Sequence, residues 1–170
     1  ACGVGDRVPN DIVKIMLLLK IQSLSYGFSG CQLATVSRLI DFFNNDVYPV
    51  VYMQGSLGAS GDLVPLAHLS LPLVGLGEVE HEGQVIPGAE LLRKFGWSPI
   101  QLASKEGLAL LNGTQNMGAF AVWALLQAHR LSDWADQIAA MSLDAYQGLT
   151  SPFIDAVHRV RPHKGQLATA

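Results

Sequence analysis

The sequence predicts a mainly helical protein with one glycine-rich loop and at most a short β-hairpin. Apolar residues recur at helical spacing in several segments, and clusters of Gly, Pro and Asn separate these segments. Of the 170 residues, 49% are hydrophobic and only 15% are charged, which provides enough apolar surface for one sizeable core. Because no internal repeat or linker is recognisable, residues 1–170 are expected to form a single mostly helical segment.

Two helices and an extended segment are expected in the first third of the chain. The first helix follows Pro9, which suits a first helical turn, and its apolar face consists of Ile12, Ile15, Met16 and Leu19. The second helix ends at Asn44-Asn45, and its apolar face consists of Leu33, Val36, Ile40 and Phe43. The β-branched and aromatic residues of 47–53 indicate an extended segment, which Pro49 keeps out of the centre of a sheet.

The rest of the chain begins with a loop at 54–62, where three glycines at three-residue spacing disfavour a helix. Asp62 then stands at the start of the apolar run 63–76, and Pro72 is expected to end or kink that helix. A short hairpin is expected at 78–86 and a short helix, closed by glycine, at 88–96. From 104 to about 148 the pattern is helical with one interruption at 112–116.

Charge and composition exclude several classes of function. The formal net charge is −3, and no Lys or Arg occurs between Arg38 and Arg93, so no nucleic-acid groove is expected. The longest uncharged stretches, 47–61 and 107–129, contain Gly or polar residues, so neither is expected to span a membrane; burial in a helical core or against partner subunits accounts for them better. Two cysteines form no disulfide framework, and the first residues lack the layout of a secretory signal, so a cytoplasmic location is expected.

Familiar interpretations of the glycine-rich loop conflict with its residues. A serine-hydrolase elbow requires G-x-S-x-G, which the residues around Ser60 miss by one position. Serine hydrolysis therefore remains only a minor alternative, with its possible bases being His68, His129, His158 and His163. A phosphate-binding loop requires Lys where Asp62 stands, and an acid there repels an anion. The histidines lack the H-E-x-x-H spacing of a metal site, so no metal is expected.

The tripeptide Ala59-Ser60-Gly61 offers a different chemistry. If the amide nitrogen of Gly61 attacks the carbonyl carbon of Ala59 and water leaves, a five-membered imidazolone forms. Loss of the Ser60 hydroxyl then gives an exocyclic methylene, which is a soft electrophile that no ordinary side chain provides. Gly61 suits this attack because its nitrogen is unhindered and it adopts torsions closed to other residues.

Four motifs occur in order along the chain. They are Tyr26-Gly27-Phe28-Ser29-Gly30, Gly55-Ser56-Leu57-Gly58-Ala59-Ser60-Gly61-Asp62-Leu63-x-Pro65-Leu66-Ala67, Lys105-Glu106-Gly107-Leu108-Ala109-Leu110-Leu111-Asn112-Gly113-Thr114-Gln115, and Arg161-Pro162-His163-Lys164-Gly165-Gln166. Together they resemble the aromatic amino acid ammonia-lyases, which carry the 4-methylidene-imidazol-5-one (MIO) group. The similarity covers essentially all 170 residues.

This resemblance implies a helical bundle of the ammonia-lyase/fumarase-like type and a homotetramer whose active sites are assembled from more than one subunit. Ala59, Ser60 and Gly61 would form the MIO group. Asn112 would hydrogen-bond that group or the bound substrate, and Asp62 would hold the loop for cyclisation. The implied substrate is an aromatic amino acid, whose amine adds to the electrophile before ammonia departs and leaves an unsaturated acid.

Gln115 and the run Arg161-Pro162-His163 favour the histidine branch of that family, whose product is urocanate. Phenylalanine or tyrosine ammonia-lyases and aminomutases remain alternatives, and so does an inert helical oligomerisation fragment. Family members are several times longer, and their catalytic tyrosine and carboxylate-binding arginine lie on segments absent here. The chain is therefore expected to be an internal fragment, and none of its four tyrosines, Tyr26, Tyr48, Tyr52 and Tyr146, matches the catalytic one.

Overall fold

The computed structural model describes residues 2–57 and 60–170, and these residues divide into two compact units. Unit 1 comprises residues 1–123 and unit 2 comprises residues 124–170. The division falls inside one long helix, α6 (Gln115–Ala145), at a point where the sequence has neither Gly nor Pro. No change in composition therefore marks this boundary, which the sequence alone does not reveal.

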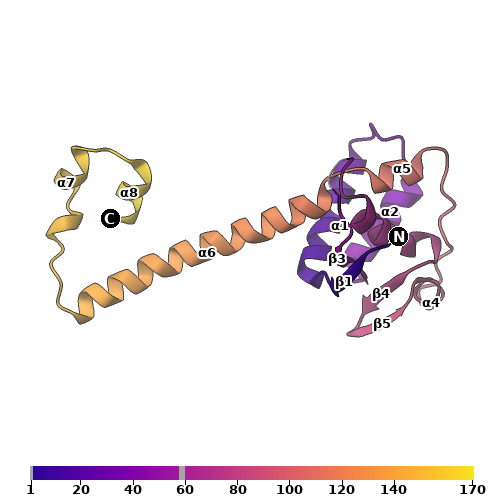
Figure 1. Ribbon diagram of the computed structural model, residues 1–170, viewed down its shortest axis with the longest axis horizontal. Helices are drawn as coiled ribbons and strands as arrows, with labels where there is room; N and C mark the ends of the chain where they lie inside the picture. Colours follow the sequence, from indigo (N-terminus) through magenta and orange to yellow (C-terminus); the bar gives the residue numbers. More distant parts are fainter. Residues whose placement is uncertain (1, 58–59) are drawn as a thin grey trace. The chain divides into compact units, whose positions relative to one another are not determined.

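Helices make up most of both units, which confirms the predicted fold class (Figure 1). In unit 1 they are α1 (Asn10–Ser25), α2 (Leu33–Asn44), α3 (Leu63–Ser70), the 3-10 helix η1 (Leu71–Val74), α4 (Gly88–Lys94), α5 (Glu106–Leu111) and the start of α6. Unit 2 contains the rest of α6, then η2 (Ser151–Phe153), α7 (Asp155–Arg159) and α8 (Lys164–Thr169).

The helix ends follow local chemistry that the sequence predicts. Proline cannot donate a backbone hydrogen bond, and α1 accordingly begins directly after Pro9. The α-helical part of the run 63–76 stops at Ser70, and Pro72 lies in the tighter η1 turn that follows. The interruption expected at 112–116 is shorter, because α6 already begins at Gln115.

The β structure is more extensive than the one short hairpin of the predicted fold class, and part of it lies in the extended segment predicted at 47–53. The expected hairpin forms from β4 (Glu78–His81) and β5 (Gln84–Pro87), which pair antiparallel at one edge of unit 1 beside α4 (Figure 1). Strand β2 (Tyr48–Pro49) joins β4 at the outside of this sheet, where a strand containing proline is tolerated. Strands β1 (Val4–Arg7) and β3 (Tyr52–Gln54) form a second, two-stranded sheet.

The core of unit 1 lies between α1, α2 and α3, and the faces that α1 and α2 bury match the predicted ones only in part. The buried residues of α1 are Ile12, Val13, Met16, Leu17, Lys20 and Leu24, while Ile15 and Leu19 are half-buried. The buried residues of α2 are Thr35, Val36, Leu39 and Phe42, while Leu33 is 81% exposed. The predicted face of α2 is therefore wrong at Leu33 and Ile40, which are exposed, while Val36 is buried and Phe43 packs half-buried against the core. Thr35 instead turns inward and donates a hydrogen bond to Glu106.

Unit 2 buries little of its own surface. The buried residue of α6, Ala119, belongs to unit 1, whereas in unit 2 the apolar side chains of Leu131, Trp134, Met141 and Val160 are exposed. Within the part of the chain that the structure describes, no helix combines the length and apolar character needed to cross a bilayer. Leu125 and Leu126, which lie within 107–129, are exposed as well, and the expectation that 107–129 packs against further protein remains a prediction.

Candidate active site at the Gly61–Gly113 contact

Two motifs that are far apart in the sequence meet through their backbones. Gly61, which follows Ser60, forms a parallel bridge with Gly113 of the Asn112-Gly113-Thr114 turn, and the Asp62 amide donates to the Gly113 carbonyl at 2.7 Å. Gly61 has φ +102°, a region that side chains rarely adopt. A Cβ on Gly61 would overlap the Gly113 carbonyl oxygen and lie 2.8 Å from the Gly113 nitrogen. Position 61 therefore requires glycine.

Asp62 is fully buried and holds this junction through its carboxylate. One oxygen, Oδ1, accepts a hydrogen bond from the Ser56 hydroxyl at 2.9 Å, and Oδ2 accepts one from the Met117 amide at 2.9 Å. Met117 lies in the first turn of α6, where amide groups lack helical partners and the helix dipole favours an anion. Asp62 also precedes α3, as the sequence predicts. The carboxylate thus joins the glycine-rich loop to the start of α6, while the Asp62 backbone carbonyl accepts the Leu66 amide at the start of α3.

The structure places only some of the predicted site residues at this junction. Ser60 lies exposed in a bend outside any helix, and Gly61 is half-buried, while the expectation for Ala59 falls outside the described residues. Asn112 caps the end of α5, is half-buried, and its side-chain amide donates to the Leu108 carbonyl at 3.3 Å. Asn112 thus reaches the junction through its neighbour Gly113, and its proposed contact with a prosthetic group or substrate remains a prediction.

Lys20, which the sequence does not single out, lies beneath this junction. Its side chain is 1% exposed, and its ammonium group donates to the carbonyl oxygens of Ala109 at 3.2 Å and Asn112 at 3.3 Å. Burial lowers the pKa of Lys20 to about 8, although the charges of Cys31 and Asp62 oppose this effect. The two acceptors belong to the last turn of α5, where carbonyl groups have no helical partner.

Glu106 anchors the other end of α5. Its buried carboxylate accepts hydrogen bonds from the Gln32 amide at 2.7 Å, the Gln32 side chain at 2.5 Å, the Thr35 hydroxyl at 2.9 Å and the Ala103 amide at 2.6 Å. Burial by itself raises the pKa of Glu106, but these bonds from Ala103, Gln32 and Thr35 outweigh it and lower the pKa from 4.5 to about 2. The short helix α5 is thus held at both ends by buried charged side chains.

Replacing Glu106 with Gln is expected to lower the free energy of unfolding by about 2–4 kcal/mol at neutral pH, because the buried donors lose a charged acceptor. Since folding lowers the pKa of Glu106 from 4.5 to about 2, its stabilising effect is complete above pH 4.5 and disappears as the pH falls towards 2. Urea denaturation should therefore show that the free energies of unfolding of wild type and Glu106→Gln approach each other as the pH falls. Glu90→Gln, at an exposed position, should show no such convergence. If the free energies of unfolding of wild type and Glu106→Gln differ by the same amount at every pH, the lowered pKa of Glu106 is contradicted.

A cavity beside the junction brings in a third motif. It has a volume of about 310 Å³ and is lined by Leu19, Gln22, Ser23, Tyr26, Thr114, Gln115 and Gly118. Tyr26 begins the Tyr26–Gly30 motif, and Thr114 and Gln115 belong to the motif that contains Asn112. The side-chain oxygens of Gln115 and Asn116 are shielded from solvent and have no hydrogen-bond partner within the described ranges. The start of α6 therefore offers two unpartnered acceptor groups, and the Met117 amide in its first turn donates to Asp62.

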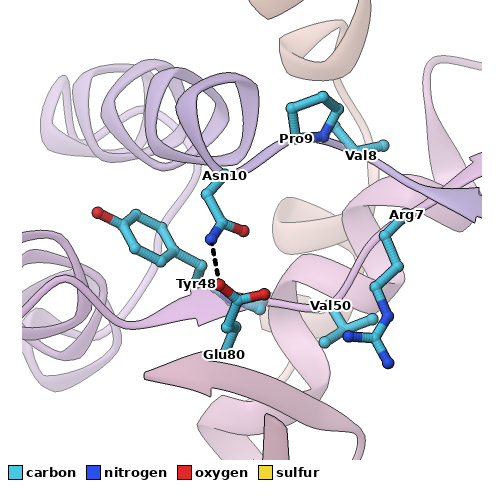
Figure 2. Close-up of a pocket in the computed structure, with 8 residues that line it drawn as sticks. Arg7, Val8, Pro9, Asn10, Tyr48, Val50 and Glu80 are labelled. Atoms are coloured by element: carbon cyan, nitrogen blue, oxygen red, sulfur yellow. Dashed lines mark hydrogen bonds between the residues drawn. The ribbon is translucent and has the colours of Figure 1, made fainter. Parts of the chain in front are cut away.

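A second cavity of unit 1 lies elsewhere and contains none of the predicted site residues. Figure 2 shows this pocket of about 260 Å³, in which the Asn10 side-chain amide donates to the Glu80 carboxylate at 2.6 Å. Tyr48 and Arg7 also line it. It connects the start of α1 with β2 and β4, so it belongs to the scaffold of unit 1.

The fourth motif lies in unit 2. There the Gln166 side-chain nitrogen is 3.0 Å from His158 Nδ1, and this contact joins α8 to the buried histidine of α7. Among residues 2–57 and 60–170, no group of three or more His, Cys, Asp or Glu side chains is arranged to hold a metal ion.

Sequence reasoning missed Ser56, Met117, Lys20 and Glu106 as parts of this site. Ser56 and Glu106 lie inside the motifs, and the hydrogen-bonding capacity of their side chains could have marked them as part of the site. Lys20 is the one charged residue among the six buried positions of α1, which is an unusual placement for lysine. The Met117 contribution comes from its backbone amide and leaves no signal in the sequence.

Comparisons with known proteins identify the family of the chain. The family model for aromatic amino acid lyase matches residues 1–170. The chain is 50% identical over its whole length to a histidine ammonia-lyase of Legionella pneumophila. A histidine ammonia-lyase structure from Trypanosoma cruzi superimposes on 99% of the chain with a TM-score of 0.92 and 38% identity. A Pantoea agglomerans phenylalanine aminomutase also superimposes on 99% of the chain, with a TM-score of 0.92 and 37% identity.

The chain spans only about a third of each of these proteins, namely 34% of the Legionella protein, 33% of the Trypanosoma chain and 32% of the Pantoea chain. The match nevertheless extends over all of its own residues and includes the loop, the turn and the helices that join them. The chain therefore belongs to the aromatic amino acid lyase family.

Proposed function

We propose that this chain is an internal fragment of an ammonia-lyase that eliminates ammonia from histidine and yields urocanate. One observation carries the proposal: the glycine of the Ala59-Ser60-Gly61 tripeptide lies against the Asn112-Gly113-Thr114 turn, and buried Asp62 ties both to α6. This arrangement supports formation of an MIO group from the tripeptide, with no metal ion required. The 50% identity to a protein named histidine ammonia-lyase supports histidine as the substrate.

The residues present fit such a group. Ser60 is exposed and outside any helix, so its hydroxyl is accessible for elimination, and the close approach at position 61 fits a glycine whose nitrogen enters a ring. When formed, the MIO group supplies an electrophile for the amino group of the substrate. Asp62 would hold the loop in position through its hydrogen bond from Met117, and the positive end of the α6 dipole would stabilise negative charge nearby.

The other residues would orient the substrate. Asn112 lies half-buried at the end of α5 and would donate its side-chain amide to the substrate or the prosthetic group. The unpartnered oxygens of Gln115 and Asn116 would accept from an amino group. The base that removes the β-proton and the group that binds the carboxylate would lie on segments outside these 170 residues. We further propose a cytoplasmic homotetramer, in which exposed apolar residues of α6 are covered by further segments or subunits.

The proposal is tested by incubating the complete purified protein separately with histidine, phenylalanine and tyrosine. Histidine should release ammonia together with an ultraviolet-absorbing unsaturated acid, at a kcat/KM at least about tenfold above the other two substrates. A preference for phenylalanine or tyrosine would move the protein to another branch of the family. A β-amino acid product would identify an aminomutase, and no product from any substrate would favour an inert helical protein.

A further inference from the structure

Lys20 stands out because a buried ammonium group without a carboxylate partner is costly. Desolvation of a charged group is unfavourable, and an apolar side chain at this position of α1 would be buried at a lower cost in free energy. Among the described residues, Lys20 forms no ion pair within 4 Å, and its hydrogen-bond acceptors are the Ala109 and Asn112 carbonyl oxygens. What Lys20 holds in place is therefore the end of α5.

The end of α5 is also the beginning of the Asn112-Gly113-Thr114 turn. The Asn112 carbonyl that Lys20 contacts is bonded directly to the Gly113 nitrogen, and the Gly113 carbonyl accepts the Asp62 amide. A Cβ on Gly61 would lie 2.8 Å from this same Gly113 nitrogen, so the two backbones are nearly in contact. A displacement of the turn by a fraction of an ångström would therefore also move the backbone of Gly61.

We propose that Lys20 is a positioning residue for the cyclisation of Ala59-Ser60-Gly61, acting through the Asn112–Gly113 backbone. This inference rests on the proposed function. Cyclisation forms a bond from the Gly61 nitrogen to the Ala59 carbonyl carbon, and the carbonyl oxygen leaves as water with the amide protons of Ser60 and Gly61. A second water carries away the Ser60 hydroxyl with the Ser60 Hα. Both steps are dehydrations, so no oxidant or reductant is needed.

Lys20 contributes by keeping the turn rigid, because an ammonium group donates to two carbonyl groups at once. The other end of α5 is fixed independently by Glu106, so loss of the Lys20 contacts would free only the end that meets Gly61. The Asn112 side chain, which starts from the same residue, would lose its orientation as well. Lys20 thus acts through Asn112 and Gly113 and touches no reacting atom.

The test compares the complete protein with Lys20→Met, Lys20→Gln and Lys20→Arg, and measures the mass of the peptide that contains Ser60 and the thermal stability. Methionine fills the space but donates no hydrogen bond, whereas arginine retains a charged donor. The wild-type peptide should be lighter by two water molecules. In Lys20→Met the fraction of dehydrated peptide should fall about tenfold or more, and Lys20→Arg should restore most of it. Lys20→Gln, a shorter neutral donor, should fall between them.

The matched control is Leu17→Ala, which removes a buried apolar side chain from the same helix and leaves the Lys20 hydrogen-bond donor and its two acceptors in place. This variant should be less stable than Lys20→Met yet fully dehydrated when expressed at low temperature. A fully dehydrated Lys20→Met protein contradicts the inference alone. If Lys20→Met does not fold, full dehydration of Lys20→Gln contradicts the inference in its place. If neither variant folds, Lys20 is needed for folding in general and the specific role in cyclisation is rejected. A wild-type peptide of unmodified mass contradicts the proposed function and this inference together.

Discussion

Replacement of Ser60 with alanine is expected to lower ammonia release from histidine by more than about a thousandfold, because alanine has no hydroxyl to leave and no electrophile forms. Ser60 is exposed, so the variant should fold and unfold like the wild type. The measurement is the rate of formation of the unsaturated acid by purified wild type and Ser60→Ala at equal concentration.

A matched control for this variant is Ser56→Ala. Ser56 lies in the same loop and donates to Asp62, so its loss should weaken the loop without removing the leaving group. We expect Ser56→Ala to retain measurable elimination. Turnover by Ser60→Ala at more than a few per cent of the wild-type rate would show that the loop acts without this hydroxyl.

Replacement of Gly61 with alanine is expected to reduce elimination by about a hundredfold or more, because the reacting backbone atoms would be displaced. Two effects combine at this position. The φ of +102° is strained for alanine, and the new Cβ would overlap the Gly113 carbonyl oxygen. The backbone bridge to Gly113 would therefore open and carry the tripeptide away from the turn. Elimination rate and peptide mass should both report this change.

Gly83→Ala separates the two effects. Gly83 lies in the turn between β4 and β5, has φ +74° and has nothing within 4 Å of a Cβ built on it. Alanine there is strained but collides with no other group, so a loss of stability of about 1 kcal/mol with unchanged elimination is expected. If the two variants lose the same activity, the contact with Gly113 has no special importance.

The sequence predicts the elements of unit 1 well where local chemistry decides them. Helix α1 begins after Pro9, the β4–β5 hairpin forms, and the chain leaves the α-helix before Pro72. These features depend on residues a few positions apart, so spacing alone is informative. Family membership was likewise predictable, because the motifs are long and occur in order.

Features that depend on tertiary partners were harder to predict. Apolar residues occupy more than one side of α2, and burial of Thr35 rather than Leu33 is decided by Glu106, which belongs to another helix. The inward position of Lys20 depends on carbonyl groups exposed only where α5 ends. The contact between Gly61 and Gly113 joins two loops through backbone atoms, which residue types do not encode.

The measurement that most directly tests the account is the mass of the proteolytic peptide containing Ala59-Ser60-Gly61, isolated from the complete active enzyme. A peptide lighter than its encoded sequence by two water molecules, with fragmentation that places the loss within these three residues, is the predicted result. An active enzyme whose peptide retains its full encoded mass would show that deamination proceeds without a backbone-derived electrophile.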